Sequence, residues 1–410
     1  MKRIIFFTGV YDTLDLFTCE LKREFEAMEF ETMIFDVNCM GESLGRLSRF
    51  MEKPVDAAIT FNNLGFNMEL HPGKNLWEEL KIPCINILMD HPFCYHAALA
   101  AAPKNAVVLC TDRNHMNYIR RFYPSIPVAG YLPHGGVETD GPKKPIKERS
   151  IDVLYAGGLS KSFAEKTIPD LTVYTDFDVK KVCKKAYHTL IKGPSKTTEA
   201  ALEEALLSEG ICCEDSRLAK IIADLHFVDL YAVSYFREQT IRILAESGIR
   251  IALYGAGWEN CSWIHLPNVY YGGRVPAEEI VEKMRDAKIV LSTMTWFKDG
   301  THDRVFNGML QGAVAVSDTS VYMKEEFSGF TEPSRADERE MILFELPEIS
   351  SLPEQMKELL GDDALMQEIA DRGYEKAKRF HTWHNRAVEL KTDILDDGEL
   401  MKYLHGGGVV

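Results

Sequence analysis

The sequence lacks long apolar runs. No stretch approaches the roughly 20 apolar residues that a membrane-spanning helix needs, and the apolar run at residues 4–7 is too short for the core of a signal peptide. This run predicts a buried first strand instead. We therefore expect no membrane span.

Cysteine pairs at metal-binding spacing are also absent. The nine cysteines are scattered, and several lie in apolar segments, as Cys84, Cys110 and Cys183 do. This usage is typical of a reduced compartment, so we expect a cytoplasmic protein. We expect no metal site, because Asp90, His91 and His96 do not form a convincing ligand set.

The chain has fewer basic than acidic residues. The chain has 62 acidic and 47 basic residues (Lys and Arg), which gives a formal net charge of −15. A general nucleic-acid binder would carry a basic footprint, so nucleic acid is not an expected partner. The strongest local basic run, at residues 143–149, predicts a solvated linker.

Buried strands alternate with helices along most of the chain, which predicts parallel, doubly wound α/β sheets. Expected strands lie at 4–8, 31–37, 57–61, 84–89, 107–111, 126–132, 152–156, 249–254, 269–271, 289–293 and 313–316. Expected helices lie at 14–28, 41–52, 94–101, 113–123, 276–285, 353–360, 364–380 and 382–395. Residues 163–248 read as a helical insertion, with a possible strand at 171–174.

The double glycine Gly135-Gly136 and the Pro- and Lys-rich stretch after it mark the boundary between two domains. We expect a first domain over residues 1–142 and a second over 143–380. Residues 381–410 would form a C-terminal helix, which can pack back on the first domain, and a frayed tail.

Segment 296–318 carries the strongest functional signal. A polar loop leads into a short helix, Gly312 ends that helix, and a buried strand closes on Ser317-Asp318. In parallel sheets, ligands collect where loops leave the strand ends and helices begin. A helix N-terminus beside His302 and Arg304 suits a phosphate-bearing ligand. The alternative is an ordinary charged loop, in which Arg304 pairs with Asp303 or Asp299.

This segment resembles the donor-binding half of GT-B glycosyltransferases. The resemblance is closest to the CgeB-like (spore protein glycosyltransferase-like) group, which is related to the glycosyltransferase group 1 superfamily. That superfamily has two glutamates separated by seven residues, and here Asp299 and Asn307 stand at the two positions. Asparagine can still hydrogen-bond a ribose hydroxyl. The two replacements leave the choice between a retaining and an inverting reaction open.

Further motifs extend the resemblance over residues 249–390. They are Tyr254-Gly255-Ala256-Gly257-Trp258, then Tyr270-Tyr271-Gly272-Gly273-Arg274-Val275-Pro276, and near the end His381-Thr382 with Arg386. The first domain matches in plan and in Leu88-Met89-Asp90-His91-Pro92. The implied fold is GT-B, in which two Rossmann-like domains face a cleft.

The resemblance implies a donor site in the second domain. A nucleoside-diphosphate sugar would be a substrate there, with no further cofactor. The implied donor-binding residues are Gly157, Gly158, Lys161, Tyr254, Gly255, Gly273, Arg274, His302, Arg304 and Asn307. Gly157-Gly158 can equally be a plain tight turn. The pattern Gly255-Ala256-Gly257 lacks the third glycine of a dinucleotide fingerprint and Trp258 crowds it, so we expect no NAD and read Trp258 as a packing residue.

The implied catalytic residues are Asp90, His91 and Asp299. Asp90 or His91 would act as general base toward an acceptor hydroxyl if the reaction inverts. The alternative is that Asp90 caps the following helix. The function implied is metal-independent transfer of a sugar to a glycan or protein acceptor. A non-catalytic assembly or coat protein and a nucleotide-sugar epimerase remain as alternatives.

Overall fold

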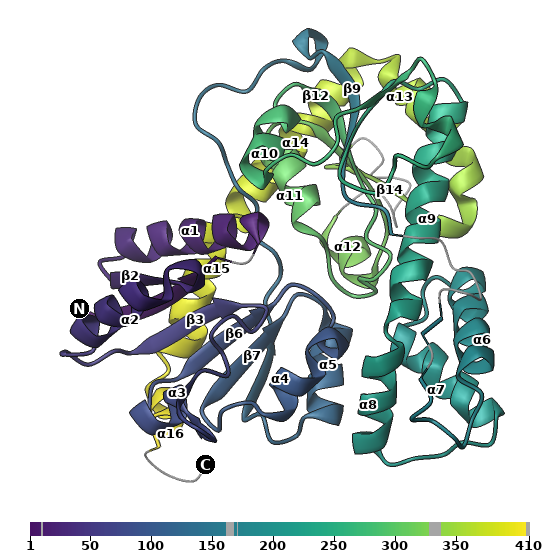
Figure 1. Cartoon of the computed structure of the whole chain (residues 1–410). Coiled ribbons are helices and arrows are strands. Elements are labelled where there is room, and N and C mark those ends of the chain that lie inside the picture. The colour runs from purple at the N-terminus through teal and green to yellow at the C-terminus, as the bar shows by residue number, and fades with distance from the viewer. Residues whose placement is uncertain (10, 161–167, 170, 328–337, 407–410) are drawn as a thin grey trace. The chain divides into compact units, whose positions relative to one another are not determined.

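The computed structural model divides into two compact units, each built around a six-stranded sheet (Figure 1). It describes residues 1–9, 11–160, 168–169, 171–327 and 338–406. The first unit comprises Met1–Val137, Pro276–Glu278 and Arg379–Val410, and the second comprises Glu138–Val275 and Glu279–Lys378. The chain therefore passes between the units at residues 137–138 and again at 378–379, besides the short excursion at 276–278.

The sheet of the first unit is parallel throughout, in the order β2-β1-β3-β6-β7-β8. Several strands are mainly apolar with every residue buried, as in β3 and β6, because helices cover both faces of such a sheet. The strands are β1 (Arg3–Thr8), β2 (Glu31–Asp36), β3 (Ala57–Phe61), β6 (Cys84–Leu88), β7 (Ala106–Cys110) and β8 (Val128–Tyr131).

The helices of the first unit include the C-terminal segment. Trp383 packs its ring 4.8 Å from that of Phe17 and 5.7 Å from that of Phe61, so α15 contacts α1 and the sheet. The helices are α1 (Asp12–Ala27), α2 (Met40–Phe50), α3 (Leu76–Leu80), α4 (His96–Ala100), α5 (Arg113–Phe122), α15 (Trp383–Leu390) and α16 (Gly398–Leu404), and a small hairpin pairs β4 (Glu69–His71) with β5 (Lys74–Asn75).

The sheet of the second unit is also parallel, in the order β11-β10-β9-β12-β13-β14. This is the doubly wound order whose direction reverses between β9 and β12, and such a reversal opens a crevice at the carboxyl ends of the two strands. The strands are β9 (Ile151–Ala156), β10 (Ile251–Tyr254), β11 (Val269–Tyr271), β12 (Ala287–Ser292), β13 (Val314–Asp318) and β14 (Ile342–Phe344). The prediction of two doubly wound parallel sheets is confirmed.

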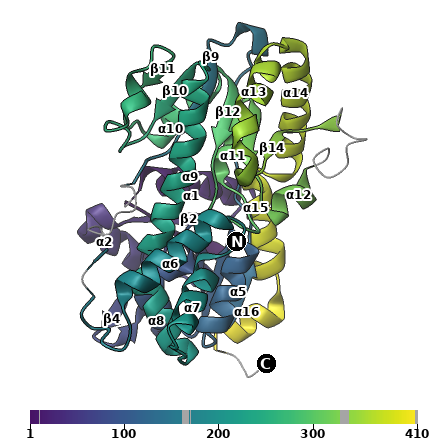
Figure 2. The same cartoon turned by 90° about the vertical axis from the view of Figure 1, so that its right-hand side faces the viewer.

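The helical insertion is also observed. In both views α6, α7 and α8 lie side by side, and α6 packs on the long helix α9 (Figures 1 and 2). The possible strand at 171–174 is wrong, because the segment is a turn in which Tyr174 N donates to Leu171 O. The helices of this unit are α6 (Val179–Lys192), α7 (Thr198–Ser208), α8 (Asp215–Leu225), α9 (Phe227–Glu246), α10 (Ala277–Met284), α11 (Asp303–Leu310), α12 (Val321–Glu326), α13 (Leu352–Leu360) and α14 (Asp363–Phe380).

Short helical turns join several of these elements. The 3₁₀ segments are η1 (Val37–Cys39), η2 (Pro92–Tyr95), η3 (Ile146–Glu148), η5 (Ser262–His265) and η7 (Leu346–Ser351), and the π-helical η8 (Lys391–Leu395) continues α15. The predicted helix at 382–395 therefore begins as an α-helix and ends as a π-helix.

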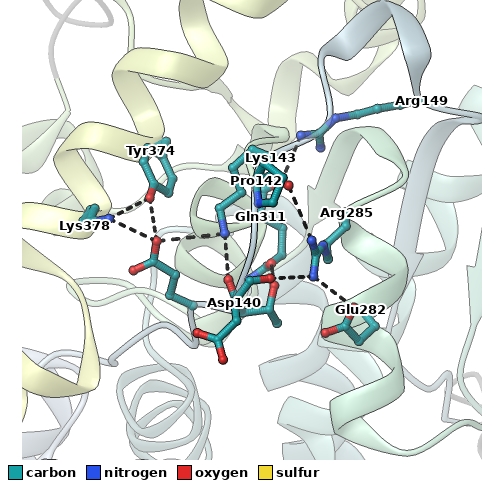
Figure 3. Close-up of polar contacts among 11 residues, drawn as sticks. Asp140, Pro142, Lys143, Arg149, Glu282, Arg285, Gln311, Tyr374 and Lys378 are labelled. Atoms are coloured by element: carbon teal, nitrogen blue, oxygen red, sulfur yellow. Dashed lines mark hydrogen bonds and ion pairs between the residues drawn. The ribbon is translucent and has the colours of Figure 1, made fainter.

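Arg149 ends the basic run 143–149 and is buried, whereas Lys144 and Lys147 of the same run are exposed, as expected for a solvated segment. Arg149 is only 4% exposed, and its guanidinium donates to carbonyl oxygens, of which that of Gln311 belongs to a residue drawn in Figure 3. Its guanidinium donates to Lys144 O at 2.8 Å, to Ala287 O at 2.8 Å and to Gln311 O at 2.9 Å. The burial of Arg149 could not be predicted from the sequence, because the carbonyls of Ala287 and Gln311 come from distant segments of the second unit.

Residues 138–142 also make hydrogen bonds to distant residues of the second unit. Thr139 Oγ1 donates to Gln311 Oε1 at 2.5 Å, and Arg285 Nη1 donates to Asp140 O at 3.0 Å (Figure 3). The Glu138 carboxylate accepts from Tyr374 at 2.5 Å and lies 3.4 Å from Lys378 Nζ. The segment after residue 137 is therefore an ordered part of the second unit.

Candidate functional site

The β9–β10 edge of the second sheet carries two interlocked glycine turns. Gly157 N donates to Tyr254 O at 2.9 Å, and Leu159 N donates to Ala256 O at 2.8 Å. Gly255 has φ +120°, and a Cβ there would lie 2.4 Å from Gly157 O, so only glycine allows this approach. Of the three amides at 157–159, only that of Gly158 makes no hydrogen bond within the described residues.

The remaining predicted residues of this edge lie beside these turns. Gly255 N donates to Gly273 O at 2.8 Å, while Tyr254 is 5% exposed and Arg274 is exposed. Trp258 is buried and donates to Gly157 O at 2.8 Å, which confirms that it is a packing residue. Lys161 lies outside the described residues.

Arg304 lies near the carboxyl ends of β9 and β12, where the strand order reverses. It belongs to the first turn of α11, and its Nη1 donates to Ser292 Oγ, at the end of β12, at 3.1 Å. Its guanidinium carbon lies 5.2 Å from the ring centre of Tyr155 in β9. A Cβ built on Gly157 would lie 3.3 Å from Arg304 Nη2, so the side chain borders the glycine turn.

Arg304 is a buried cation, and the described residues provide no close counter-ion. It is 7% exposed, and no carboxylate of the described residues lies within ion-pair distance. The predicted alternative, an ion pair with Asp303 or Asp299, is therefore not what the structure shows. Burial lowers the pKa of the guanidinium, which is partly offset by Tyr155. An arginine keeps its proton even so, and a buried unpaired charge is costly unless an anion binds beside it.

His302 precedes α11 and forms its N-cap. Its Nδ1 lies 2.6 Å from Asp303 Oδ1 and 3.2 Å from Arg304 N. Both contacts cannot be hydrogen bonds at once, because the first needs a proton on Nδ1 and the second needs a lone pair. We favour the shorter contact, which leaves Nε2 as the acceptor of a neutral ring. Burial lowers the pKa of His302, against the opposing effect of Asp303.

Asn307 lies one helical turn after Asp303. Its Nδ2 donates to Asp303 Oδ2 at 2.9 Å, and the residue is only 4% exposed. The three side chains of His302, Asp303 and Asn307 thus form a hydrogen-bonded series along α11. Asn307 is therefore not a helix-surface residue. Its amide nitrogen binds the Asp303 carboxylate.

The loop that contains Asp299 is held from β13 and α12. Asp318 Oδ1 accepts from Met294 N at 2.7 Å, and Ser320 Oγ donates to Gly300 O at 2.6 Å. Asp318 is 1% exposed, and burial raises the pKa of its carboxyl from 3.8 to about 6. Asp299 is half-buried in this loop.

Arg237 is a site residue that the sequence did not reveal. It lies on α9, donates from Nη1 to Gly158 O, and holds its guanidinium carbon 5.2 Å from the ring centre of Trp296. Its Nε is buried without a hydrogen-bond partner in the described chain. Arg237 and Arg304 both act electrostatically on His302. Both also border the glycine turn, which therefore has two neighbouring cations. A helix within a long insertion offers no motif that would single it out.

Asp90 belongs to the first unit, at the carboxyl end of β6. It is exposed and accepts hydrogen bonds from Asn62 Nδ2 at 2.9 Å and Tyr95 at 2.8 Å. Asn62 and the next residue, Asn63, both have left-handed φ, at +46° and +64°, which is uncommon for residues other than glycine. Burial, and then Asp90 itself, raise the pKa of Tyr95.

His91 lies next to Asp90 but is turned into the protein. It is 7% exposed, its ring stacks on Phe93 at 3.7 Å, and its Nδ1 accepts from Phe93 N at 3.2 Å. His91, and not Asp90, is therefore the cap of the following turn, so the capping alternative for Asp90 is wrong.

Two absences concern the described residues. No group of three or more His, Cys, Asp or Glu side chains there is arranged to hold a metal ion. Nor is any helix of the described chain long and apolar enough to cross a bilayer.

Comparisons with known proteins agree with this geometry. Residues 237–392, which include Arg237, Arg304 and Asn307, match the model of a family described as "Glycosyl transferase-like". No curated protein sequence matches the chain.

Solved structures of glycosyltransferases share the fold. An α-glucosyltransferase in complex with UDP superposes with a TM-score of 0.56 at 13% identity, over 96% of this chain and 99% of that one. Sucrose-phosphate synthase from Thermosynechococcus elongatus gives 0.52 at 10% identity, over 100% of both chains. The Anabaena protein HepE, in complex with UDP and glucose, gives 0.51 at 11% identity, over 96% and 100%. The chain therefore has the GT-B fold.

Proposed function

We propose that this protein is a glycosyltransferase that takes its sugar from a nucleoside-diphosphate sugar bound at the β9–β12 crevice. The buried guanidinium of Arg304, which borders the glycine turn with no close carboxylate among the described residues, is the observation that carries the proposal. The family match over residues 237–392 supports it. UDP is the first nucleotide to test, because two proteins of this fold are complexes with UDP.

Arg304, Arg237 and the Gly158 amide would bind the diphosphate. Negative charge grows on the leaving diphosphate as the glycosidic bond breaks, and fixed cations and N–H donors directed at it lower the barrier. Two guanidinium groups can supply this charge without a metal. Arginine also offers a planar pair of donors for phosphate oxygens.

His302 would face the transferred sugar. A neutral ring with its proton on Nδ1, held by Asp303, has Nε2 as its hydrogen-bond acceptor, the chemistry that a sugar hydroxyl requires. We assign Asn307 first to holding Asp303, and the expected ribose contact of Asn307 remains a prediction. Tyr254, Gly255, Gly273 and Arg274 lie along the same strand ends and would border the nucleoside.

Asp90 is the proposed general base of the first unit in an inverting reaction. Its carboxylate is exposed, and two neighbouring side chains orient it. It would take the proton of the acceptor hydroxyl while that oxygen forms the new bond to the sugar. His91 would orient this segment by capping and packing. Asp299 is the acidic candidate on the donor side, at the position where relatives have glutamate.

The test is release of nucleoside diphosphate from a panel of nucleotide sugars in the presence of EDTA, with and without glycan acceptors. We expect one nucleotide sugar to be turned over, and the rate to fall at least 100-fold in Arg304→Ala. Asp90→Asn should lower kcat while KM for the donor stays unchanged. Turnover that is the same in Arg304→Ala would overturn the assignment of the site. Formation of an epimer without acceptor would show an epimerase instead.

A further inference from the structure

The exposed face of α6 is a basic strip on an acidic protein. The helix carries Lys180, Lys181, Lys184, Lys185, His188 and Lys192, all exposed, and no acidic residue. At about 100° per residue these six side chains fall within an arc of about 140°, and they span about 18 Å along the helix. The opposite side (Val182, Cys183, Ala186 and Leu190) is buried.

Most of this basic strip is not neutralised by residues that the structure describes. Lys181 pairs with Glu209 at 2.5 Å. Within the described chain, Lys180, Lys184, Lys185 and Lys192 have no carboxylate within ion-pair distance. Positive charge left unpaired in a chain of net charge −15 is therefore local and directed outward.

The segment that follows α6 is hydrogen-bonded to the loop that contains Asp299. Pro194, two residues after α6 ends, accepts a hydrogen bond through its carbonyl from Lys298 Nζ at 2.5 Å. Lys298 belongs to the loop between β12 and α11, immediately before Asp299. Lys192, two residues before Pro194, lies at the end of α6 that adjoins this contact. Lys180 lies at the other end of the helix.

We infer that the α6 strip binds an extended anionic glycan and guides it toward the donor site. This inference rests on the proposed function and names the acceptor class. Lysines recurring at one helical turn match charges repeated along a flexible chain, and lysine acts as a point charge without fixed geometry. The strip has no arginine and no large exposed apolar side chain, so neither directional phosphate pairing nor insertion into a bilayer is favoured.

The test compares two triple variants with equal loss of charge. One is Lys184→Gln/Lys185→Gln/Lys192→Gln on α6. The matched control is Lys147→Gln/Lys357→Gln/Lys402→Gln, three exposed lysines elsewhere. The probes are fluorescent dextran sulfate, neutral dextran and a single-stranded oligothymidylate, each measured by anisotropy at several salt concentrations.

We expect dextran sulfate to bind the wild type and the control triple within twofold of each other. Binding to the α6 triple should weaken at least tenfold, with a shallower dependence on salt because fewer counterions are released. Neutral dextran should not bind. Equal dextran sulfate affinity in both triples would overturn the inference. Oligothymidylate bound as tightly as dextran sulfate, and lost in the same triple, would make the strip a nucleic-acid surface instead.

Thermal shift with UDP in the same variants separates this inference from the proposed function. If both hold, the α6 triple keeps its UDP shift and loses dextran sulfate. A wild type that binds no nucleotide but needs α6 for dextran sulfate would sink the proposed function, and with it the role of the strip as an acceptor track. If UDP shifts the thermal unfolding but the α6 changes do not affect dextran sulfate binding, the proposed donor site stands. The inference about the α6 strip is then overturned.

Discussion

Arg304 Nη1 donates a hydrogen bond to Ser292 Oγ at 3.1 Å, and this contact joins the start of α11 to the end of β12. It places a guanidinium where the strand order of the second sheet reverses. A neutral hydroxyl is a weak partner for a buried charge, so the apo protein is expected to carry an electrostatic cost that a bound anion would relieve.

Replacement of Arg304 by methionine should stabilise the apo protein. The change keeps much of the side-chain volume and removes a buried cation that lacks a close counter-ion, so we expect a gain of about 1–3 kcal/mol in the free energy of unfolding. Urea unfolding without ligand measures this. A loss of stability greater than about 1 kcal/mol would show that the guanidinium is a structural group.

Asp318 should make stability fall as pH rises. Its folded-state pKa of about 6 lies above the usual 3.8, so the folded protein binds the proton more tightly between these values. The free energy of unfolding should therefore decrease between about pH 4 and pH 6 by an amount on the order of 2–3 kcal/mol. Asp318→Asn removes this group but keeps an oxygen for Met294 N. The difference between variant and wild type should shift in favour of the variant as pH rises, and parallel pH profiles would contradict the account.

Gly255 and Gly273 offer a matched pair of glycine replacements. Both have positive φ, at +120° and +67°, but a Cβ at Gly273 meets nothing within 4 Å, whereas one at Gly255 would lie 2.4 Å from Gly157 O. Gly273→Ala should cost only about 1–2 kcal/mol, the price of a left-handed alanine. Gly255→Ala should cost clearly more or prevent folding. Thermal unfolding compares the two, and equal losses would mean that the glycine turns are not interlocked.

Asp303 should keep the pKa of His302 from falling further. Burial lowers this pKa, and the Asp303 carboxylate opposes the change. Asp303→Asn should therefore move the titration of His302 to lower pH, as followed by NMR of labelled histidine. Exposed His188 on α6 serves as the internal control. An unchanged titration of His302 would show that Asp303 does not influence its pKa.

Much of the fold followed from the sequence because buried parallel strands are mainly apolar. The strand at 57–61 was predicted with the observed bounds of β3. Strand β14 (Ile342–Phe344) was missed, although β11, which is equally short, was predicted. The burial of Arg149 within the basic run 143–149 was not predicted, because Arg149 is bonded to carbonyls that only the folded chain brings together.

The donor-site prediction was helped by local motifs and limited by distant contacts. Arg304 and His302 stand in one recognisable loop, so the sequence could name them. Arg237 comes from a helix nearly 70 residues earlier in the chain, and its approach to Gly158 depends on how α9 packs. The position of Asn307 was found correctly on α11, but its bond to Asp303 needed the helix itself, in which residues four apart face each other.

Calorimetric titration with UDP and UMP, in the presence of EDTA, tests the central claim most directly. If Arg304 and Arg237 hold the second phosphate, the wild type should bind UDP at least tenfold more tightly than UMP, because a charge-assisted hydrogen bond contributes about 1.5–3 kcal/mol. Arg304→Met should remove that preference, while Lys147→Met, an exposed control, should keep it. Equal binding of UDP and UMP by the wild type, or a preference that survives in Arg304→Met, would contradict the account.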